Sequence, residues 1–511
     1  MSDNKLAFYD FSGGINTSST QVMLGYGAKK LNWDDSYNVE LYKNQGVARM
    51  SGNQTLLDDD VEDNCAIIAI CEYPGATDGF VYARKDGKIK HYSNITRLSA
   101  VIFDYKKEIT SVEFTRYLDG VVFFASGCEG YYYNVSAEDE KVKPLNIKDS
   151  KDDNICPDAA CTFAGRIWLA KDSTLYFSAL GRYDDWESEN DAGYIANFHS
   201  SVTKISALAL YCGNLAIFKS DGVYLLSGTS PDNFAVVKFA DKGVFGSRAV
   251  CTCNNKQYFF NSDGLFALSQ VGELSQIMMS GNIASPIENT FKEMDKSRIS
   301  EAFCVPYEKK NQIWFYLPFA GNLYFQTIMI YDFANDCWTK RIEEQNITCA
   351  ANVYSEVVSG CSGGRILMEN IGSTFDGEPI KFSFSTPFFH LGKPSERKII
   401  EDFALLLDET GENRFKFSVS KDFVKEIRSD WEYIKTTQTG SLIWASFDEA
   451  KTAYNCFETS YNPTWARSYQ STIGVQIFDS NLSVALHIEG EEEGDGFKLV
   501  GIEFKELLND F

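Results

Sequence analysis

Short stretches of alternating hydrophobic and polar residues recur between residues 60 and 370, and turn-forming residues separate them. In one such unit, residues 205–210 lead through Cys212 and Gly213 into LAIFK, and Asp221 and Gly222 then lead into VYLLSG. Alternation with a period of two is typical of strands that bury one face, and Gly- or Asn-containing turns between such strands predict hairpins. We therefore expect a meander of short antiparallel strands.

Similar units begin near residues 67, 112, 161, 205, 249, 303 and 350. Their spacing, about 40 to 50 residues, is that of the blades of a β-propeller. One small sheet cannot bury both of its faces, so blades pack face to face around an axis. We expect an all-β chain with a propeller of six or seven blades over residues 61–372, flanked or closed by an N-terminal extension, residues 1–60. Two stacked β-sandwiches are the alternative.

One helix is expected near residues 285–297. Ser285 suits the N-cap, Pro286 suits the first helical position, and Ile287, Phe291 and Met294 fall on one helical face. Its place between two strand units predicts a helix inserted between blades and packed on the outside.

Residues 373–511 have a different pattern, with longer strand-like runs between acidic or Gly-rich turns. The runs are residues 380–384, 399–407, 415–419, 474–478, 483–488 and 497–504. They predict a β-sandwich-like C-terminal domain. Trp431, Trp444 and Trp465 are expected in loops between its strands.

Composition agrees with sheets and limits the function. Aromatic residues make up 14% of the chain, with 38 Phe and 27 Tyr, and such side chains suit pleated, half-buried surfaces. The formal net charge is −23, from 71 acidic and 48 basic residues. Phosphate binding needs clusters of Lys and Arg, so the charge argues against a surface that grips nucleic acid. It is compatible with a conduit through which nucleic acid slides, or with an ordinary acidic surface.

The chain is expected to be soluble and made in the cytoplasm. Its N-terminus lacks the basic start and apolar core of a signal peptide, and no apolar run approaches the roughly 20 residues that span a bilayer. The 13 cysteines are scattered singly in apolar strand-like runs, for example Cys65, Cys71, Cys161, Cys304 and Cys349. This pattern is typical of small buried side chains in a reducing compartment.

Metal chemistry has little support in the sequence. None of the four histidines pairs with another at metal-ligand spacing, so structural roles are expected for His91, His199, His390 and His487. Cys251 and Cys253 form a C-x-C pair with no second pair and no adjacent His. The acidic runs at residues 58–60 and 151–153 lack the alternating register of a calcium loop.

Catalytic motifs are equally weak. Residues 360–364 are Gly-rich but are not followed by the Lys and Ser or Thr of a phosphate loop, and there is no G-x-S-x-G elbow. Asp184, Asp185 and Glu187 lie beside Trp186, and paired carboxylates next to an aromatic ring suit a sugar. A solvated acidic loop is the simpler interpretation. We expect a non-enzymatic chain with no catalytic, cofactor-binding or metal-binding residues and no cofactor.

Several motifs together resemble a known family. Residues 11–16 read FSGGIN and are followed by Asn38, Gly46, Arg49 and Gly52. Further motifs are FAGRIWLAKDSTLYFSALGRYDDW from residue 163, ISALALYCGNLAIFKSDGVYLLSG from 205, GVFGSRAV from 243, YFFNSDGLFALS from 258, and IYDFANDCW from 330. This series resembles the tail nozzle and packaged-DNA stabilisation proteins of short-tailed, podovirus-like bacteriophages, over most of the chain.

The resemblance implies a virion structural protein of the phage tail, without catalytic residues. It implies a propeller-based subunit of a homo-oligomeric ring, a hexamer, that lies next to portal and adaptor proteins and docks tail fibres or spikes. Such a tail hub extends the channel for double-stranded DNA, takes part in genome retention and DNA ejection, and binds no specific sequence. Residues 53–63 and 138–153, the most acidic stretches between strands, are candidates for the lumen or rim of that ring.

Two other functions remain open at this stage. A carbohydrate-binding or carbohydrate-active propeller in a receptor-binding tail component would depend on residues such as Asp185 and Trp186. A cellular scaffold propeller would bind peptides on its top face, but WD and kelch signatures are missing from the turns.

Overall fold

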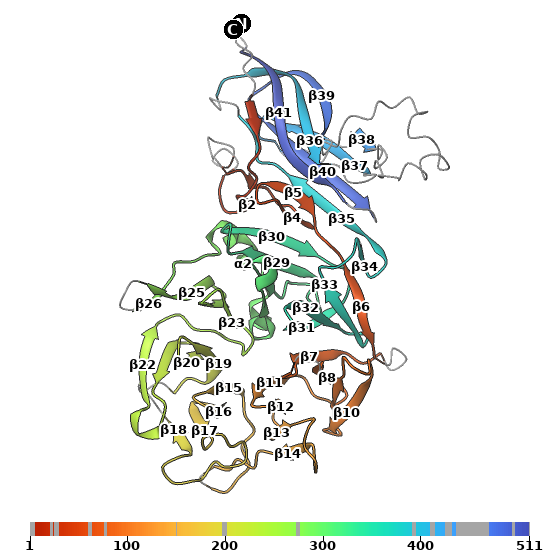
Figure 1. Cartoon of the computed structure of the whole chain (residues 1–511). Coiled ribbons are helices and arrows are strands. Elements are labelled where there is room, and N and C mark those ends of the chain that lie inside the picture. The colour runs from red at the N-terminus through yellow and green to blue at the C-terminus, as the bar shows by residue number, and fades with distance from the viewer. Residues whose placement is uncertain are drawn as a thin grey trace, which may run out of the picture. The chain divides into compact units, whose positions relative to one another are not determined.

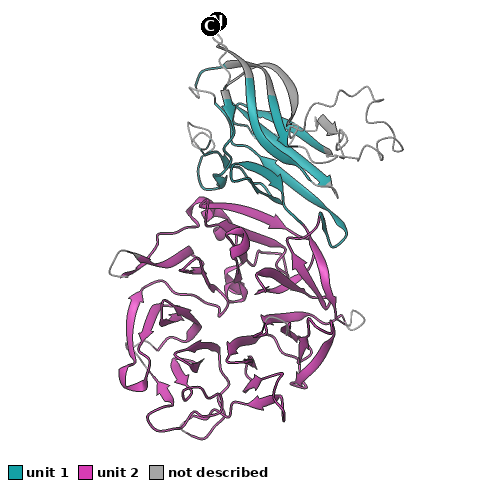
Figure 2. Ribbon diagram, in the orientation of Figure 1, with its two compact units in different colours: residues 1–51, 373–511 teal, residues 52–372 magenta. Residues whose placement is uncertain are grey.

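The computed structural model describes most of the 511 residues, in the ranges 6–20, 24, 30–59, 64–75, 79–149, 151–196, 202–271, 276–390, 395–408, 414–424, 432–435, 470–492 and 496–509. The chain forms two compact units (Figure 2). One contains residues 52–372, and the other contains residues 1–51 together with residues 373–511.

Four-stranded antiparallel sheets build the unit of residues 52–372. The first three are β7 (Ile67–Glu72), β8 (Phe80–Arg84), β9 (Lys88–Tyr92) and β10 (Ser99–Asp104); β11 (Val112–Tyr117), β12 (Gly120–Ala125), β13 (Gly130–Tyr133) and β14 (Val142–Pro144); and β15 (Ala159–Phe163), β16 (Arg166–Lys171), β17 (Thr174–Phe177) and β18 (Gly193–Ile195).

The next three sheets follow in the same order from inner to outer strand. They are β19 (Ile205–Tyr211), β20 (Asn214–Lys219), β21 (Gly222–Ser227) and β22 (Ala235–Ala240); β23 (Val250–Cys253), β24 (Lys256–Asn261), β25 (Gly264–Val271) and β26 (Gln276–Met279); and β27 (Phe303–Tyr307), β28 (Gln312–Tyr316), β29 (Thr327–Asp332) and β30 (Cys337–Ile342). The last comprises β31 (Ile347–Val353), β32 (Glu356–Cys361), β33 (Arg365–Glu369) and β6 (Asn53–Asp58).

The sheets close into a ring (Figure 1). Each innermost strand lies beside that of the next sheet, from β7 through β11, β15, β19, β23 and β27 to β31, and β31 lies beside β7 again. The predicted β-propeller is therefore confirmed, and the described residues give it seven blades, the higher of the two expected numbers.

Tight turns join the two inner strands of several blades. Ala164 and Gly165, Cys212 and Gly213, and the pair Asn254–Asn255 all have positive φ angles between 48° and 71°. Two consecutive residues of this kind form the type I′ turn, whose twist matches that of the two strands it joins. These dipeptides explain why the strands on either side of them pair directly.

Hydrophobic side chains fill the space between neighbouring blades. Between the first and second blades, for example, Val81 and Ile89 pack in one cluster with Val121 and Phe123. The facing sides of these two sheets are therefore buried, and the inner strand β12 is buried at every position, as its continuous apolar sequence requires.

The N-terminal strand β6 closes the ring, because it pairs antiparallel with β33 as the outer strand of the last blade. Gly52, which precedes β6, and Asn53, the first residue of β6, contact a buried charge cluster. Arg341 binds Glu343 and, at 2.9 Å, Glu369, while Asn53 Nδ2 donates to Glu343 at 2.8 Å. All three charged side chains are at most 1% exposed. The cluster ties the closing strand to the sixth blade.

A second buried charge cluster lies just after β6. Asp59 accepts hydrogen bonds from Lys90 at 2.6 Å and from Arg84 at 3.3 Å. Both cations belong to the first blade and are largely buried. The closing strand is thus held by ion pairs to the blade on either side of it.

The helical segment differs in detail from its prediction. Ser285 is not the N-cap; the 3-10 helix η4 (Ser285–Ile287) follows Ala284, whose backbone N–H is accepted by Asn282 Oδ1, and η4 leads into α2 (Glu288–Lys292). No side chain caps η4, because Ala284 takes the N-cap position and has no side-chain acceptor.

The face of this segment is buried as predicted, with Ile287, Phe291 and Met294 at most 4% exposed. Phe291 contacts Trp338 of the sixth blade. The following 3-10 helix, η5 (Lys296–Glu301), lines the central cavity described below through Arg298, Ser300 and Glu301, which lie beyond the predicted segment. Among the described residues, the other short 3-10 helices are η3 (Pro231–Asn233) and η6 (Glu308–Lys310).

The second unit contains two sheets that pack as a sandwich. One has the order β39-β36-β41-β5-β4, with β1 also paired to β41, and the other contains β34, β35, β40, β37 and β38. Their bounds, with those of the short parallel pair β2 and β3, are β1 (Leu6–Phe8), β2 (Gly14–Ile15), β3 (Asn32–Trp33), β4 (Val39–Tyr42), β5 (Gly46–Arg49), β34 (Thr374–Phe375), β35 (Glu378–Ser385), β36 (Lys398–Asp408), β37 (Arg414–Lys421), β38 (Glu432–Lys435), β39 (Gln470–Asn481), β40 (Val484–Glu492) and β41 (Lys498–Asn509). Phe382 stacks on Phe497 with ring centroids 5.4 Å apart, and this contact joins the two sheets.

The N-terminal boundary differs from the expected one. Residues 1–51 fold with the C-terminal unit and not as an extension of the propeller. The fully buried strand β5 pairs with β41 through Ala48 and Val47, whose partners are Lys498 and Leu499. Only the segment from Gly52 onwards belongs to the propeller, where β6 closes the ring. The loops around Trp431, Trp444 and Trp465 lie outside the described residues.

Within the described residues, no helix is long and apolar enough to cross a membrane. The twelve cysteines in those ranges are all free thiols.

Candidate functional site

Two parts of the propeller carry side chains that are not buried in its core: the outer strands of the blades and the central cavity. In the first six blades, the outer strand has one edge without a paired strand in the described residues. Exposed edges of this kind are usually short or carry charged side chains, because they otherwise pair with another chain.

Three consecutive blades have large apolar side chains exposed on their outer strands. Tyr194 on β18 is 62% exposed, Val237 on β22 is 60% exposed, and Met278 on β26 is 53% exposed. Met279, next to Met278, is 36% exposed. We call these four residues the rim belt. Apolar surface on an unpaired sheet edge is a feature of protein interfaces.

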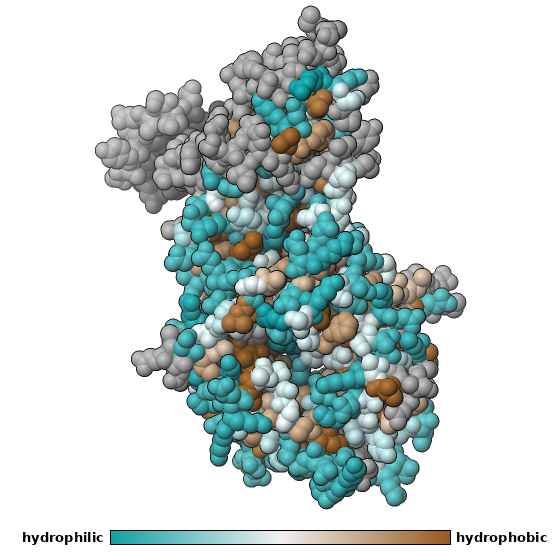
Figure 3. Space-filling model, turned by 180° about the vertical axis from the view of Figure 1, so that it is seen from behind, coloured by the Kyte–Doolittle hydropathy of each residue, from teal (hydrophilic) through white to brown (hydrophobic). Residues whose placement is uncertain are grey.

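A groove of about 530 Å³ lies within this rim, between the third and fourth blades. Phe177, Tyr194, Phe234 and Val236 line it, together with Pro231 of the short helix η3. An apolar groove therefore lies next to the exposed side chains of the rim belt. The same surface has both side chains that project from it and a groove that could accept side chains of another copy. From behind, the molecule displays its apolar residues as separate patches among polar ones (Figure 3).

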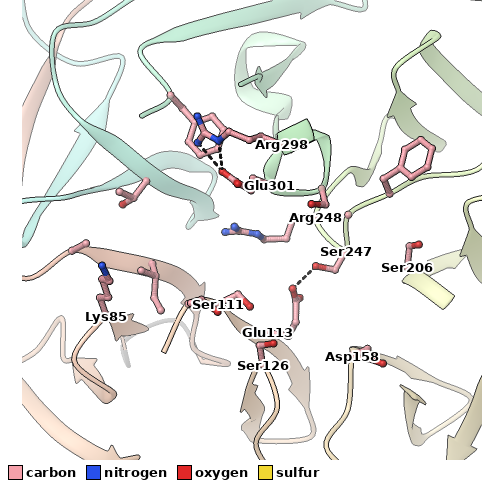
Figure 4. Close-up of a pocket in the computed structure, with 18 of the residues that line it drawn as sticks. Lys85, Ser111, Glu113, Ser126, Asp158, Ser206, Ser247, Arg248, Arg298 and Glu301 are labelled. Atoms are coloured by element: carbon pink, nitrogen blue, oxygen red, sulfur yellow. Dashed lines mark hydrogen bonds and ion pairs between the residues drawn. The ribbon is translucent and has the colours of Figure 1, made fainter. Parts of the chain in front are cut away.

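The central cavity has a volume of about 710 Å³. Residues from all seven blades and from η5 line it (Figure 4). Glu113 from β11 and the adjacent Ser247 and Arg248, which precede β23, also line a second cavity of about 270 Å³. We call these three residues the neck, because they are shared by both cavities.

Hydrogen bonding and burial fix the neck. The Ser247 hydroxyl donates to Glu113 Oε1 (Figure 4). Burial raises the pKa of Glu113, and the nearby charge of Arg248 and the Ser247 hydrogen bond oppose that rise. The Arg248 guanidinium lies over the Phe303 ring, 5.0 Å from its centroid. The aromatic ring holds the cation in place in a cation–π contact.

Two other cations in the central cavity are neutralised locally. Arg298 binds Glu301 at 2.7 Å and donates to two backbone carbonyls, and Lys204 binds Asp158 at 3.0 Å. These pairs fix the wall of the cavity without using the neck.

The acidic loop that was considered as a sugar site, with a solvated loop as the simpler interpretation, has structural contacts. Asp184 pairs with Arg182 at 2.9 Å, and Asp185 accepts hydrogen bonds from the Ser188 backbone N–H and hydroxyl. The hydrogen bond from Arg182 lowers the pKa of Asp184, and that from Ser188 lowers the pKa of Asp185. The two carboxylates therefore organise a turn. The third, Glu187, is exposed on the same loop.

Trp186 is half-buried, and its indole N–H donates to the Tyr183 carbonyl at 3.0 Å. It packs against the cluster between the second and third blades. The ring is part of the core and is not a free platform beside the carboxylates.

The histidines that the structure describes have structural surroundings. His91 is hydrogen-bonded to the Tyr133 hydroxyl at 2.8 Å, and His487 is bonded to the hydroxyls of Ser420 and Ser385 at 2.9 Å. His390 is 2% exposed, and His199 lies outside the described residues.

The described residues contain no group of three His, Cys, Asp or Glu side chains that could hold a metal ion. Cys251 and Cys253 are both buried on one face of β23, and burial raises the pKa of the Cys253 thiol. Asp149 accepts the backbone N–H groups of Lys151 and Asp153, so the acidic run at residues 151–153 forms a turn.

The acidic stretches proposed for a lumen have different places. Residues 53–58 are the outer strand β6, and Asp59 is buried in ion pairs. Residues 138–149 include β14, the outer strand of the second blade, and residues 60–63 and 150 lie outside the described residues. The Gly-rich stretch 360–364 packs closely, since a Cβ on Gly360 would lie 2.8 Å from Cys349 Sγ.

The sequence did not single out the neck. Glu113 is a polar residue in an alternating strand, and Ser247 and Arg248 lie in GVFGSRAV, which was noted for its resemblance and not for chemistry.

The chain was compared with protein families, curated proteins and solved structures. No protein-family model matches it, and no curated protein matches it. Among solved structures, YCF48 from Cyanidioschyzon merolae is 8% identical, with a TM-score of 0.41, covering 63% of this chain and 99% of that one. The WD40 β-propeller domain of Doa1 is 12% identical, with a TM-score of 0.40, covering 62% and 96%. A catalytically inactive virginiamycin B lyase from Staphylococcus aureus, solved with quinupristin, is 8% identical, with a TM-score of 0.43, covering 62% and 98%. At these values the likenesses carry no inference about function.

Proposed function

We propose that the chain is a structural subunit of a phage tail nozzle, in which copies associate through the outer strands of their propellers into a closed ring. The observation that carries the proposal is the rim belt, because it places exposed apolar side chains on unpaired edges of three consecutive blades. The series of motifs that resembles nozzle proteins supports the same role.

The rim is suited to a contact between copies of one chain. In a ring, one surface of a subunit meets a different surface of the next, and the rotation between them closes the circle. The projecting side chains of Val237 and Met278 and the groove beside Tyr194 are two such surfaces. Burying the exposed apolar area would supply the driving force at about 25 cal/mol per Å².

The charge of the chain suits a channel for DNA. With 71 acidic and 48 basic residues, a ring of six copies repels the phosphate backbone, so DNA passes without being held by its walls. In this role the ring retains the genome by closing the channel, and contacts portal or adaptor proteins at one end and fibres or spikes at its outside.

The test compares charged substitutions on and off the rim. Light scattering after size exclusion is expected to give about 345 kDa for six copies of the 57.5 kDa chain. Val237→Lys and Met278→Lys are each expected to shift the mass towards the monomer, because a lysine at the contact must lose its hydration. Leu118→Lys is the matched control, since Leu118 is also 60% exposed but lies at the turn between β11 and β12.

All three variants are expected to keep the melting temperature of the unaltered chain, because the substituted side chains are exposed. A monomeric unaltered chain, or a ring that Val237→Lys and Met278→Lys leave intact, contradicts the proposal.

A further inference from the structure

The central cavity carries a net positive charge within a strongly acidic chain. Four cations line it, Lys85, Lys204, Arg248 and Arg298, against the three carboxylates of Glu113, Asp158 and Glu301. The excess is therefore one positive charge, whereas the chain as a whole has a net charge of −23. Two of the four cations are paired, Arg298 with Glu301 and Lys204 with Asp158.

Arg248 is held in place but keeps its donors. Its guanidinium lies over the ring of Phe303. The face of the ring interacts with the positive charge, so the N–H groups of the guanidinium remain available as hydrogen-bond donors. Among the described residues, Arg248 makes no side-chain hydrogen bond and no ion pair within 4 Å. Figure 4 shows its guanidinium reaching into the space between the labelled side chains. Such a planar fork recognises a carboxylate or phosphate with two parallel hydrogen bonds.

Hydroxyl groups surround this cation. The side chains of Ser111, Ser126, Ser206 and Ser300 line the cavity, and none of these hydroxyls is hydrogen-bonded within the part of the chain that the structure describes. A hydroxyl can both donate and accept, so a group of them suits a ligand that also carries several hydroxyls.

An apolar surface completes the lining. Phe245 lines the cavity and is 46% exposed, which is unusual for a phenylalanine. The cavity volume, about 710 Å³, is within the range of about 300–1,000 Å³ that is common for small-molecule sites.

We propose that this cavity binds an acidic sugar, that is, a hexuronate or a glycan end that carries one. Arg248 binds the carboxylate and Lys85 adds a second positive charge, while Ser111, Ser126 and the Glu113 carboxylate bind the sugar hydroxyls. The exposed ring of Phe245 packs against the apolar face of the sugar. This inference concerns the centre of the propeller and does not depend on the proposed ring.

The experiment titrates glucuronate into the full-length chain, with ligand-observed NMR and calorimetry as readouts. Glucose is the neutral arm with the same hydroxyl pattern on its ring, and acetate is the arm with a carboxylate but no hydroxyls. Glucuronate is expected to bind at least 10-fold more tightly than either of them. Arg248→Gln is expected to reduce the affinity at least 10-fold.

A second variant keeps the test independent of folding. Lys85 is an exposed residue with no ion pair in the described structure, so Lys85→Gln leaves the fold intact and is expected to weaken binding severalfold. Lys292→Gln is the matched control, because Lys292 is an exposed cation whose partner is Glu288 and it does not line the cavity. It is expected to leave binding unchanged.

Several results would overturn the inference. One is an absence of glucuronate binding at 10 mM, a ligand concentration on the order of ten times a weak 1 mM Kd. Others are an affinity for glucuronate that equals the affinity for glucose or for acetate. The last is binding of glucuronate by Arg248→Gln that is as tight as binding by the unaltered chain. None of these results bears on the oligomeric mass, so failure of the sugar site and failure of the ring are distinguished.

Discussion

The cluster of Arg341, Glu343 and Glu369 predicts that closure of the propeller depends on pH. One buried guanidinium lies between two buried carboxylates, and burial together with the charge of Glu343 raises the pKa of Glu369 to about 8. In the unfolded chain the pKa of a glutamate is about 4.3. The perturbation that tests this is Glu369→Gln, which keeps the shape of the side chain and removes its ionisation.

The sign of the effect follows from proton binding. Between pH 4.3 and 8 the folded state holds a proton on Glu369 that the unfolded state has released, so this carboxyl lowers the stability as the pH rises. One pKa unit corresponds to about 1.4 kcal/mol, so over three pH units the loss is on the order of 4 kcal/mol as an upper limit. Glu369→Gln is expected to remove that loss, so that its stability relative to the unaltered chain increases from pH 5 to pH 8.

The assay combines urea unfolding with hydrogen exchange at pH 5, 6.5 and 8. Exchange of the amides of β33 and β6 reports the closing strand directly, which matters because the chain has two units. Glu288→Gln is the control, since Glu288 is 51% exposed and pairs with Lys292 on the surface. Exposed pairs of this kind contribute about 0–1 kcal/mol.

The reasoning is refuted if the stability difference between Glu369→Gln and the unaltered chain does not change between pH 5 and pH 8. It is also refuted if Glu288→Gln changes the pH dependence of β6 protection as much as Glu369→Gln does.

Two further predictions concern the same ring. Asp59→Asn is expected to cost about 3–5 kcal/mol of stability in urea unfolding, because it removes the buried carboxylate that Lys90 and Arg84 share, although Arg84 keeps its ion pair with Asp86; a loss under 1 kcal/mol contradicts this. Gly243→Ala is expected to cost on the order of 3 kcal/mol in the same assay, because its Cβ would lie 1.6 Å from the Lys219 carbonyl oxygen, and an unchanged melting curve contradicts that.

Much of the fold was predictable because its signals are local. Strands of the propeller are bounded by turn residues such as Gly165, Gly213 and Gly222, and each of them has a positive φ angle in the structure. Alternation between these turns places one set of side chains on each face of a blade, which explains why the repeat was visible.

What could not be predicted depends on residues far apart in the sequence. The pairing of β5 with β41 joins residues about 450 positions apart, and no local pattern in residues 46–49 distinguishes it from a strand of the propeller. The helix start was misplaced by one residue, because Ala284, which has no side-chain acceptor, takes the N-cap position in place of Ser285.

The candidate sites show the same division. Asp185 and Trp186 were candidates for a sugar site because they are adjacent in the sequence. In the structure, Asp185 organises a turn and Trp186 packs in the core. The neck brings together Glu113 and Arg248, which lie on different blades, and only the closed ring places them in one cavity.

The most direct test of the account is an electron-microscopy reconstruction of the unaltered full-length chain as it assembles in solution. We expect a closed six-fold ring in which β18, β22 and β26 face the neighbouring copy. Single unassembled chains, or a ring whose copies touch through other strands and leave Tyr194, Val237 and Met278 in solvent, would contradict it.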